Sequence, residues 1–283
     1  MAEAQPLPAD SAPPTRLERA RGLARIAVRA DSDGRTRLDR LHQAGSAKVR
    51  LPRVPVDAPL QAILLNTAGG ITGGDELTCE VVVGDGAGAV VATQAAERIY
   101  RRSAGSAAVA TSLSVGAGAR LDWLPQETIL FDRSSLERRL TADVHQTGTL
   151  LAVEAIVLGR AAMGETVRQA GLNDVWRIRR DGRLVFADGF RFNGDATAIM
   201  AGAATGGGAT AFAILILVAP DAAARLEAAR AALNDSASEA GASAWNGMLL
   251  ARLLAPTSQA LRGDLIRLIE TLRGEAMPRV WSC

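Results

Sequence analysis

Apolar side chains recur at every second position along much of this chain, which is the spacing of residues on one face of a β-strand. The pattern is clearest in the segments 77–83, 109–115 and 140–144. Between such segments the chain is interrupted by breaks that contain glycine, at 84–88, 116–118, 147–148 and 205–208. The alternation and the frequent breaks predict a β-rich body of mostly short strands from about residue 40 to residue 219.

Two local signals refine this prediction. Asp181-Gly182 lies between two β-rich runs in DVWRIRRDGRLVFAD and indicates a two-residue hairpin turn. Glycine supplies the positive φ that such a turn requires, because it has no Cβ to clash. Farther along, the apolar run FAILILVA at 212–219 predicts a buried strand.

After residue 219 the pattern predicts two α-helices. Pro220 suits a first helical position, and PDAAARLEAARAALND spaces its apolar residues helically. The second helix is TSQALRGDLIRLIETLRG, whose apolar face is formed by Leu261, Leu265, Leu268 and Leu272. Its N-cap is expected at Thr257 or Ser258, and Gly274 is expected to end it. WNGMLLARLLA resembles another strand, and the alternative, that 248–255 joins a helix, is not settled by the apolar periodicity.

The first 20 residues are rich in proline and lack the order of a secretory signal, so they predict a disordered arm. Residues 21–283 are expected to form one domain. The net charge of +2 is too small to indicate nucleic-acid binding, and the longest apolar run is too short to cross a bilayer. The only cysteines, Cys79 and Cys283, suggest no disulfide framework. We therefore expect a soluble, cytoplasmic protein with neither nucleic acid nor membrane as a partner.

The glycine-rich loop in LLNTAGGITGGD, residues 64–75, invites comparison with phosphate-binding loops. A Walker-type loop needs a lysine for the phosphates and a Ser or Thr for magnesium, whereas here Asp75 follows the glycines. The carboxylate of Asp75 would repel phosphate, so we expect that the chain does not bind GTP. The loop is better explained as a tight backbone corner at Gly69, Gly70, Gly73 and Gly74.

Signatures of catalysis are scarce. The chain has no G-x-S-x-G elbow and no H-E-x-x-H motif, and His42 and His145 are its only histidines. Carboxylate pairs need no local motif. A β-rich hydrolase or carbohydrate-active enzyme using Glu97 and Glu127 is therefore the alternative function.

Acidic side chains stand out in apolar or glycine-rich segments. The four clearest cases are Asp75, Glu97, Glu127 and Glu165. A buried carboxylate is costly unless it is paired or hydrated, so such groups gather beside arginines or water-filled spaces. The structural explanation is that Asp75 caps its turn, that Glu97 pairs with Arg101, and that Glu165 pairs with Arg160.

Several of these segments together resemble the family of the urease accessory protein UreD, also called UreH. The resemblance covers about residues 40–281, and the segment 220–260 matches only loosely. The motifs that carry it are NTAGGITGGD (66–75), TQAAERIYR (93–101), WLPQETILFD (123–132), GRAAMGE (159–165) and PRVW (278–281).

The resemblance implies a function that composition does not show. Members of the family are not enzymes. They join UreF and the GTPase UreG on apo-urease (UreABC), where nickel enters the active site with UreE as the usual donor. The implied fold is mainly β, a β-helix-like stack of strands with two α-helices toward the C-terminus. No cofactor is expected to bind tightly, and nickel is expected only in transit.

The resemblance also suggests roles for particular residues. Water-filled passages are proposed as the nickel route in the family's complexes, so Asp75, Glu97, Glu127 and Glu165 are candidate lining residues. Nickel prefers imidazole and thiolate, which this chain nearly lacks, so carboxylates would hold it weakly enough to release it. Arg279 and Trp281 are candidate partner contacts, because Arg and Trp are enriched at binding hot spots. Tyr100 and Arg101 are further candidates, and the isolated chain is expected to need partners to stay soluble.

Overall fold

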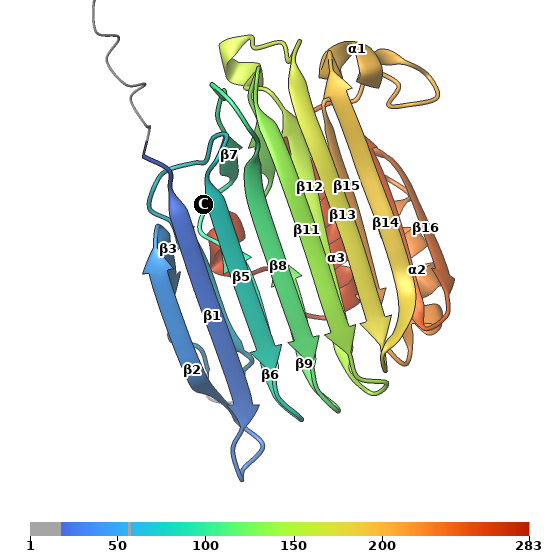
Figure 1. Ribbon diagram of the computed structural model, residues 1–283. Coiled ribbons are helices and arrows are strands. Elements are labelled where there is room, and N and C mark those ends of the chain that lie inside the picture. Colours follow the sequence, from blue (N-terminus) through green and yellow to red (C-terminus); the bar gives the residue numbers. More distant parts are fainter. Residues whose placement is uncertain (1–17, 56–57, 283) are drawn as a thin grey trace, which may run out of the picture.

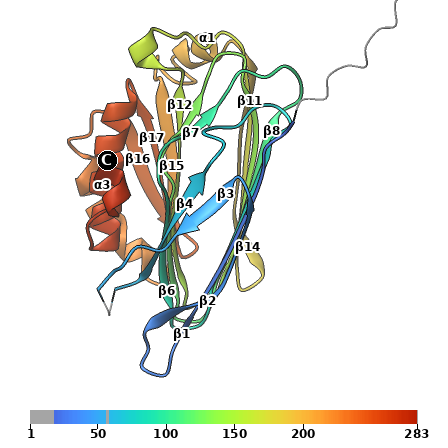
Figure 2. The same ribbon diagram turned by 90° about the vertical axis from the view of Figure 1, so that its left-hand side faces the viewer.

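The computed structural model describes residues 18–55 and 58–282, and it consists mainly of two β-sheets that face each other (Figures 1 and 2). One sheet has seven strands in the order β14-β13-β11-β8-β5-β1-β2. Its strands are β1 (Arg21–Ala30), β2 (Thr36–Gly45), β5 (Glu76–Val83), β8 (Ala107–Val115), β11 (Ser135–Val144), β13 (Ala170–Arg180) and β14 (Arg183–Gly194).

The other sheet has ten strands, eight of them in the order β16-β17-β15-β12-β9-β6-β4-β3, with β10 and β7 joined beside β12. These strands are β3 (Ala47–Arg50), β4 (Leu60–Asn66), β6 (Gly88–Thr93), β7 (Glu97–Ile99), β9 (Arg120–Leu124), β10 (Thr128–Leu130), β12 (Thr149–Leu158), β15 (Ala211–Val218), β16 (Glu239–Trp245) and β17 (Met248–Ala255).

The chain passes repeatedly from one sheet to the other, as a β-solenoid does. From β5 to β13 the chain alternates between the two sheets, with the consecutive strands β6 and β7, and β9 and β10, lying in the same sheet. Neighbouring strands within each sheet, such as β5 and β8 or β6 and β9, are parallel. This confirms the β-helix-like prediction. Several strands are longer than expected, because the glycine breaks mark the corners between sheets and leave the strands between them whole; β13 has 11 residues and β14 has 12.

The β-rich body also begins earlier than expected, at Arg21 in place of residue 40. In β1 the buried residues Ala24, Ile26 and Val28 alternate with more exposed ones, Arg25, Ala27 and Arg29. Most residues of β2 are exposed and give no alternation. Residues 18–20 have no regular secondary structure, and residues 1–17 lie outside the described residues. The division into an arm and one domain stays a prediction.

The hairpin turn at Asp181-Gly182 is confirmed. It joins β13 to β14, and both residues have positive φ, 48° for Asp181 and 73° for Gly182. The segment 248–255 forms strand β17. It pairs with both β15 and β16, and this pairing is the tertiary contact that periodicity could not reveal.

Both predicted C-terminal helices are present, as α2 (Leu226–Leu233) and α3 (Ser258–Arg273). They cover the outer face of the ten-stranded sheet (Figure 2). A 3-10 turn, η2 (Ala222–Arg225), precedes α2, so that helix begins later than Pro220. The short helix α1 (Ala196–Ala201), capped by Asp195, was not expected, and the remaining 3-10 turns are η1 (Ala161–Met163) and η3 (Arg279–Ser282). No helix among the described residues is long and apolar enough to span a bilayer.

Helix α3 has the termini that the sequence predicts. The hydroxyl of Thr257 accepts a hydrogen bond from the Ala260 amide at 3.1 Å, and Gly274 ends the helix with φ of 71°. We expect Thr257→Ala to lower the free energy of unfolding by about 1 kcal/mol, because the first helical turn loses its cap. Chemical denaturation checks this, with Ser258→Ala as the control because Ser258 does not cap the helix. Equal losses in the two variants would contradict it.

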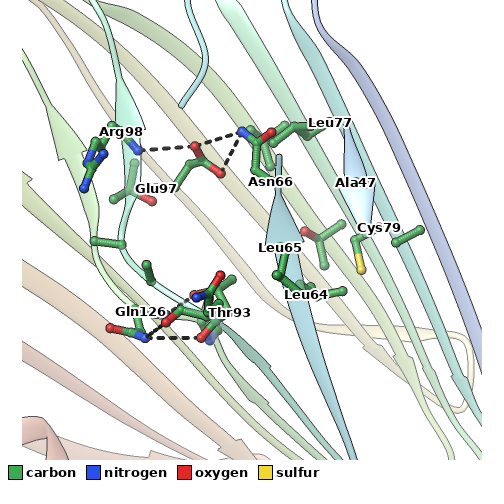
Figure 3. A pocket seen from close by; sticks show the side chains of 18 of the residues that line it. Ala47, Leu64, Leu65, Asn66, Leu77, Cys79, Thr93, Glu97, Arg98 and Gln126 are labelled. Carbon is green, nitrogen blue, oxygen red and sulfur yellow. Dashed lines mark hydrogen bonds between the residues drawn. The ribbon is translucent and has the colours of Figure 1, made fainter. Parts of the chain in front are cut away.

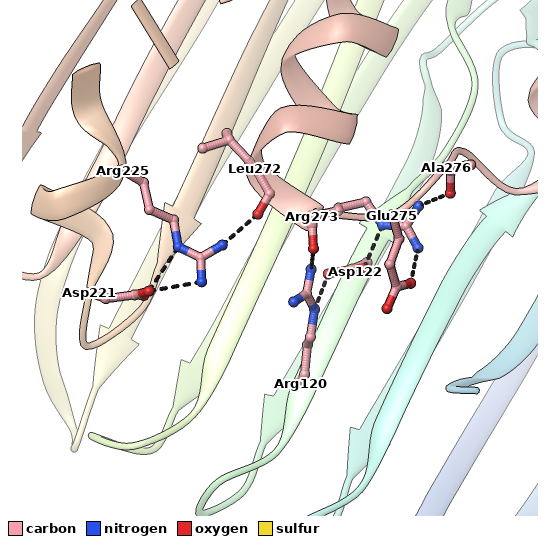
Figure 4. A network of polar contacts seen from close by, with 8 residues as sticks. All are labelled: Arg120, Asp122, Asp221, Arg225, Leu272, Arg273, Glu275 and Ala276. Carbon is pink, nitrogen blue, oxygen red and sulfur yellow. Dashed lines mark hydrogen bonds and ion pairs between the residues drawn. The ribbon is translucent and has the colours of Figure 1, made fainter. Parts of the chain in front are cut away.

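The C-terminal end of α3 is tied to the sheet by arginines (Figure 4). The buried Arg273 donates to Asp122 on β9 at 2.8 Å, and Arg120 donates to the other oxygen of that carboxylate at 3.1 Å. Arg225 donates to the carbonyl of Leu272 at 2.6 Å. Because Asp122 is 1% exposed, Arg120 and Arg273 provide the charge that its burial requires.

Candidate functional site

The glycine-rich loop after β4 forms the expected tight corner. Gly69, Gly70 and Gly74 have positive φ, and a Cβ on Gly70 would lie 2.3 Å from the ring of Tyr100. A Cβ on Gly73 would lie 2.1 Å from a backbone carbonyl, so close approach also requires glycine there. Asp75 accepts hydrogen bonds from the amides of Thr72 at 2.8 Å and Ala20 at 2.9 Å, which confirms that it caps the turn.

Beside this corner, a cavity of about 300 Å³ lies between the two sheets. Its wall combines apolar side chains with a few polar ones (Figure 3). The polar and sulfur-containing side chains in the wall include Asn66, Cys79, Glu97, Arg98, Gln126 and Glu154. A space of this size with several polar groups can hold ordered water.

Glu97 is the one of the four candidate acids that lines this cavity. Its carboxylate accepts hydrogen bonds from the Asn66 side-chain amide at 3.1 and 3.3 Å and from the Arg98 backbone amide at 3.3 Å. The expected pairing with Arg101 is wrong, since no ion pair of the described residues includes Glu97. Burial raises the pKa of Glu97, and the hydrogen bond from Asn66 opposes that rise only in part.

Glu127 is buried and paired with an arginine. Arg262 on α3 donates to both of its oxygens, at 2.9 and 3.0 Å. The same guanidinium donates to the Trp281 carbonyl at 2.6 Å and lies 4.8 Å from the centre of the Trp281 ring. Glu127 therefore connects the ten-stranded sheet, α3 and the C-terminal segment, and it does not border the cavity beside Glu97.

Glu165 forms the expected ion pair with Arg160, at 2.8 Å. It also accepts a hydrogen bond from the Asp132 amide at 3.1 Å. The hydrogen bond from Arg160 is the main reason why the pKa of Glu165 is lowered. This carboxylate, like Asp75, fixes the local fold.

The candidate partner contacts differ in how exposed their side chains are to solvent. Arg101 and Arg279 are exposed. Tyr100 is half-buried, donates to the Gly69 carbonyl at 2.9 Å and packs edge-on against Phe131. Trp281 is 2% exposed and donates from its indole to the Leu124 carbonyl at 3.0 Å, so its ring packs on the body. A partner role for these residues stays a prediction.

The sequence alone did not reveal a buried charged cluster, two of whose members, Arg138 and Glu154, line the same cavity. Arg138 on β11 lies between Asp174 on β13 and Glu154 on β12, and all three are buried. Trp123 donates from its indole to Glu154 at 3.2 Å. The rule that singled out Glu97, a charge within an apolar segment, applies equally to Glu154 in LLAVEAIVL and could have found it.

Strong metal ligands do not gather in the part of the chain that the structure describes. No group of three or more His, Cys, Asp or Glu residues there is placed to hold a metal ion. Burial raises the pKa of Cys79 to about 12, so this thiol in the cavity wall is protonated at neutral pH. His145 contacts Thr147 within a turn. The cavity can therefore offer oxygen atoms of moderate affinity to a cation.

Comparison with known proteins decides the family. The family model described as UreD urease accessory protein matches residues 20–282. The chain is 50% identical over 269 residues to the urease accessory protein UreD of Rhizobium rhizogenes, covering 95% of this chain and 97% of that protein. The chain belongs to the UreD family of urease accessory proteins.

Other relatives agree with this assignment. The urease accessory protein UreD of Xanthobacter autotrophicus is 47% identical over 280 residues, covering 97% of this chain and 96% of the relative. UreD 1 of Brucella melitensis is 46% identical over 271 residues, covering 94% and 95%. The UreD family consists of non-catalytic chaperones that serve urease maturation and the assembly of its nickel centre. This sets the hydrolase alternative aside.

Proposed function

We propose that this chain joins UreF and UreG on apo-urease in the cytoplasm and assists GTP-dependent insertion of nickel into the urease active site. In this proposal the chain is a scaffold and a conduit, and UreG binds and hydrolyses GTP. Nickel is cargo that crosses the space between the two sheets. UreE supplies it from outside the complex.

The observation that carries the conduit is the position of Glu97. Its carboxylate lies in the wall of the cavity between the sheets and is held by amide N–H groups, and none of the ion pairs among the residues that the structure describes includes it. A carboxylate whose ionised form is destabilised by burial gains stability when a cation comes close. Glu97 is therefore suited to attract a divalent cation into the cavity.

The chemistry of the wall also favours release. Carboxylate and amide oxygens hold nickel less tightly than imidazole or thiolate would, and the one thiol in the wall is protonated. A conduit must bind its ion strongly enough to admit it and weakly enough to let it leave. The remaining candidates, Asp75, Glu127 and Glu165, would have to leave their present partners to contact the ion, so we give Glu97 the leading role.

Reconstitution tests the proposed function. We expect the full chain to co-elute with UreF in size-exclusion chromatography and, with UreG, to form a complex with apo-urease. Urease activation by nickel should then require both this chain and GTP, while the isolated chain binds no GTP at micromolar concentrations. Activation at the same rate without this chain would contradict the proposal, as would GTP binding by the chain alone.

A further inference from the structure

The space between the two sheets contains a polar layer between two apolar ones. On the adjacent strands β11 and β13 and on β12 of the opposite sheet, the residue two positions before the charged one and the residue two positions after it belong to different apolar clusters. The triplets are Leu136, Arg138 and Leu140 on β11; Leu172, Asp174 and Trp176 on β13; and Ala152, Glu154 and Ile156 on β12. The charged residues therefore lie at one level, in a layer that runs across the strands.

Two cavities meet in this layer. The first is the cavity of about 300 Å³ that contains Glu97, and we call it the first chamber. The second chamber, of about 630 Å³, lies where β13 and β14 face β15 and β17. Among the residues that line the two chambers, Arg138 and Glu154 are the two that line both. These two side chains therefore form the partition between the chambers.

The second chamber also has a polar rim. Asp188 on β14 and Arg252 on β17 both line it and form an ion pair of 2.7 Å that joins the two sheets. Their side chains are 28% and 60% exposed, so the chamber reaches the surface beside them. Together the two chambers extend from Glu97 through the polar layer to this edge of the molecule.

Arg138 is bound more strongly to the seven-stranded sheet than to the ten-stranded sheet. Arg138 donates to both oxygens of Asp174, at 2.6 and 3.1 Å, and Asp174 is its neighbour in the seven-stranded sheet. Towards the ten-stranded sheet, only one nitrogen, Nη1, reaches Glu154, and it also donates to Thr128 at 3.3 Å. A bidentate arginine–carboxylate pair is the stronger arrangement. The contact with Glu154 is therefore the one that separates more easily.

We propose that Arg138 is a gate between the two chambers, closed in the free chain by its contact with Glu154 and opened when that contact breaks. Arg138 keeps its two hydrogen bonds to Asp174 as it moves. Glu154 keeps the hydrogen bond from Trp123 and becomes a bare carboxylate facing both chambers. The gate rests on the proposed function, since it regulates the passage of nickel.

In the closed state the Arg138 side chain lies at the partition, and its charge also affects a cation there. The guanidinium is positive at all physiological pH values, and in the closed state it offsets the negative charge of Glu154 at the partition. Moving Arg138 away from Glu154 leaves the negative charge of that carboxylate facing the cation. Burial raises the pKa of Glu154 in spite of Arg138, so the charged carboxylate is costly and a cation would stabilise it.

A double variant imitates the open gate. Arg138→Met with Asp174→Asn removes one positive and one negative charge, so the net charge is unchanged while Glu154 loses its arginine. The single Arg138→Met variant would leave two buried carboxylates unpaired and is less suitable. In equilibrium dialysis of the full chain with nickel at about 100 μM, we expect the double variant to retain about ten times more nickel than the unchanged protein.

A third substitution, Glu154→Gln, tests whether Glu154 is the group that binds nickel in the double variant. Adding Glu154→Gln should return nickel retention to the level of the unchanged protein. Equal retention by the unchanged protein and a folded double variant would overturn the gate, as would retention that survives Glu154→Gln.

A milder variant tests the gate in case the double variant does not fold. Glu154→Gln alone keeps the shape of the side chain, and we expect it to slow urease activation about tenfold with assembly intact. Glu137→Gln, on the exposed side of β11, is the matched control. If Glu97→Gln slows activation but Glu154→Gln does not, the passage stands and the gate fails. If neither slows it, the passage itself fails.

Discussion

Trp281→Ala is expected to lower the free energy of unfolding by about 3–5 kcal/mol, the cost of removing a large buried aromatic side chain. Trp281 is 2% exposed and packs in the cluster between the ten-stranded sheet and its covering helices. Its indole also donates to the Leu124 carbonyl, which would lose that hydrogen bond. The stacked Arg262, which holds Glu127, would lose its aromatic contact as well.

Urea denaturation of the full chain measures this effect. Trp245→Ala is the matched control, because Trp245 is 40% exposed at the end of β16. The control should change the free energy of unfolding by about 0.5 kcal/mol or less. A loss at Trp281 no larger than at Trp245 would show that the C-terminal segment does not stabilise the body.

Glu97→Gln is expected to stabilise the free chain at neutral pH while it slows urease activation about tenfold. The folded-state pKa of Glu97 is raised above its ordinary value of 4.5, so the native state binds protons more readily than the unfolded state. The stability of the unchanged protein therefore falls as pH rises from the unfolded pKa through the folded one. Glutamine does not titrate, so Glu97→Gln loses no stability from this group over that pH range.

Denaturation at several pH values checks the sign of this effect. The two proteins should differ least at pH values below 4.5, and the advantage of Glu97→Gln should grow as pH rises above that value. A variant that is less stable than the unchanged protein at neutral pH would show that the Glu97 carboxylate is a structural group. A gain in stability with a loss of activation marks it as a functional one.

The strongest local patterns were sufficient to predict much of the fold. The alternation in β5, β8 and β11 depends on which face of a strand is buried, and the sequence displays this directly. The two ends of α3 could be predicted for a similar reason, since Thr257 and Gly274 act through backbone groups a few residues away.

Elements that depend on distant contacts were missed or left open. Strand β17 was ambiguous because an apolar run suits a strand or a helix until its neighbours are known. Strand β2 is a sheet edge with mostly exposed residues, so it shows no periodicity. Helix α1 has only six residues, too few for a helical pattern to be distinct.

The candidate site shows the same limit. The pairing of Glu165 with Arg160 is local and was predicted, whereas Arg262 reaches Glu127 across 135 positions of the sequence. The layer of Arg138, Glu154 and Asp174 likewise requires the register of β11 with β13 and the packing of β12 from the opposite sheet. The family, by contrast, could be recognised from motifs that occur in a fixed order along the chain. Each of these motifs forms a corner or a strand of the fold.

Transfer of radioactive nickel to apo-urease is the most direct test of a passage through this chain. The assembled complex with UreF and UreG would contain the unchanged protein, Glu97→Gln or the exposed control Glu137→Gln, with assembly confirmed by chromatography before nickel and GTP are added. We expect nickel to reach urease about ten times more slowly with Glu97→Gln, equivalent to about 1.4 kcal/mol in the barrier, and at an unchanged rate with Glu137→Gln. Equal rates for all three complexes would contradict a nickel route past Glu97.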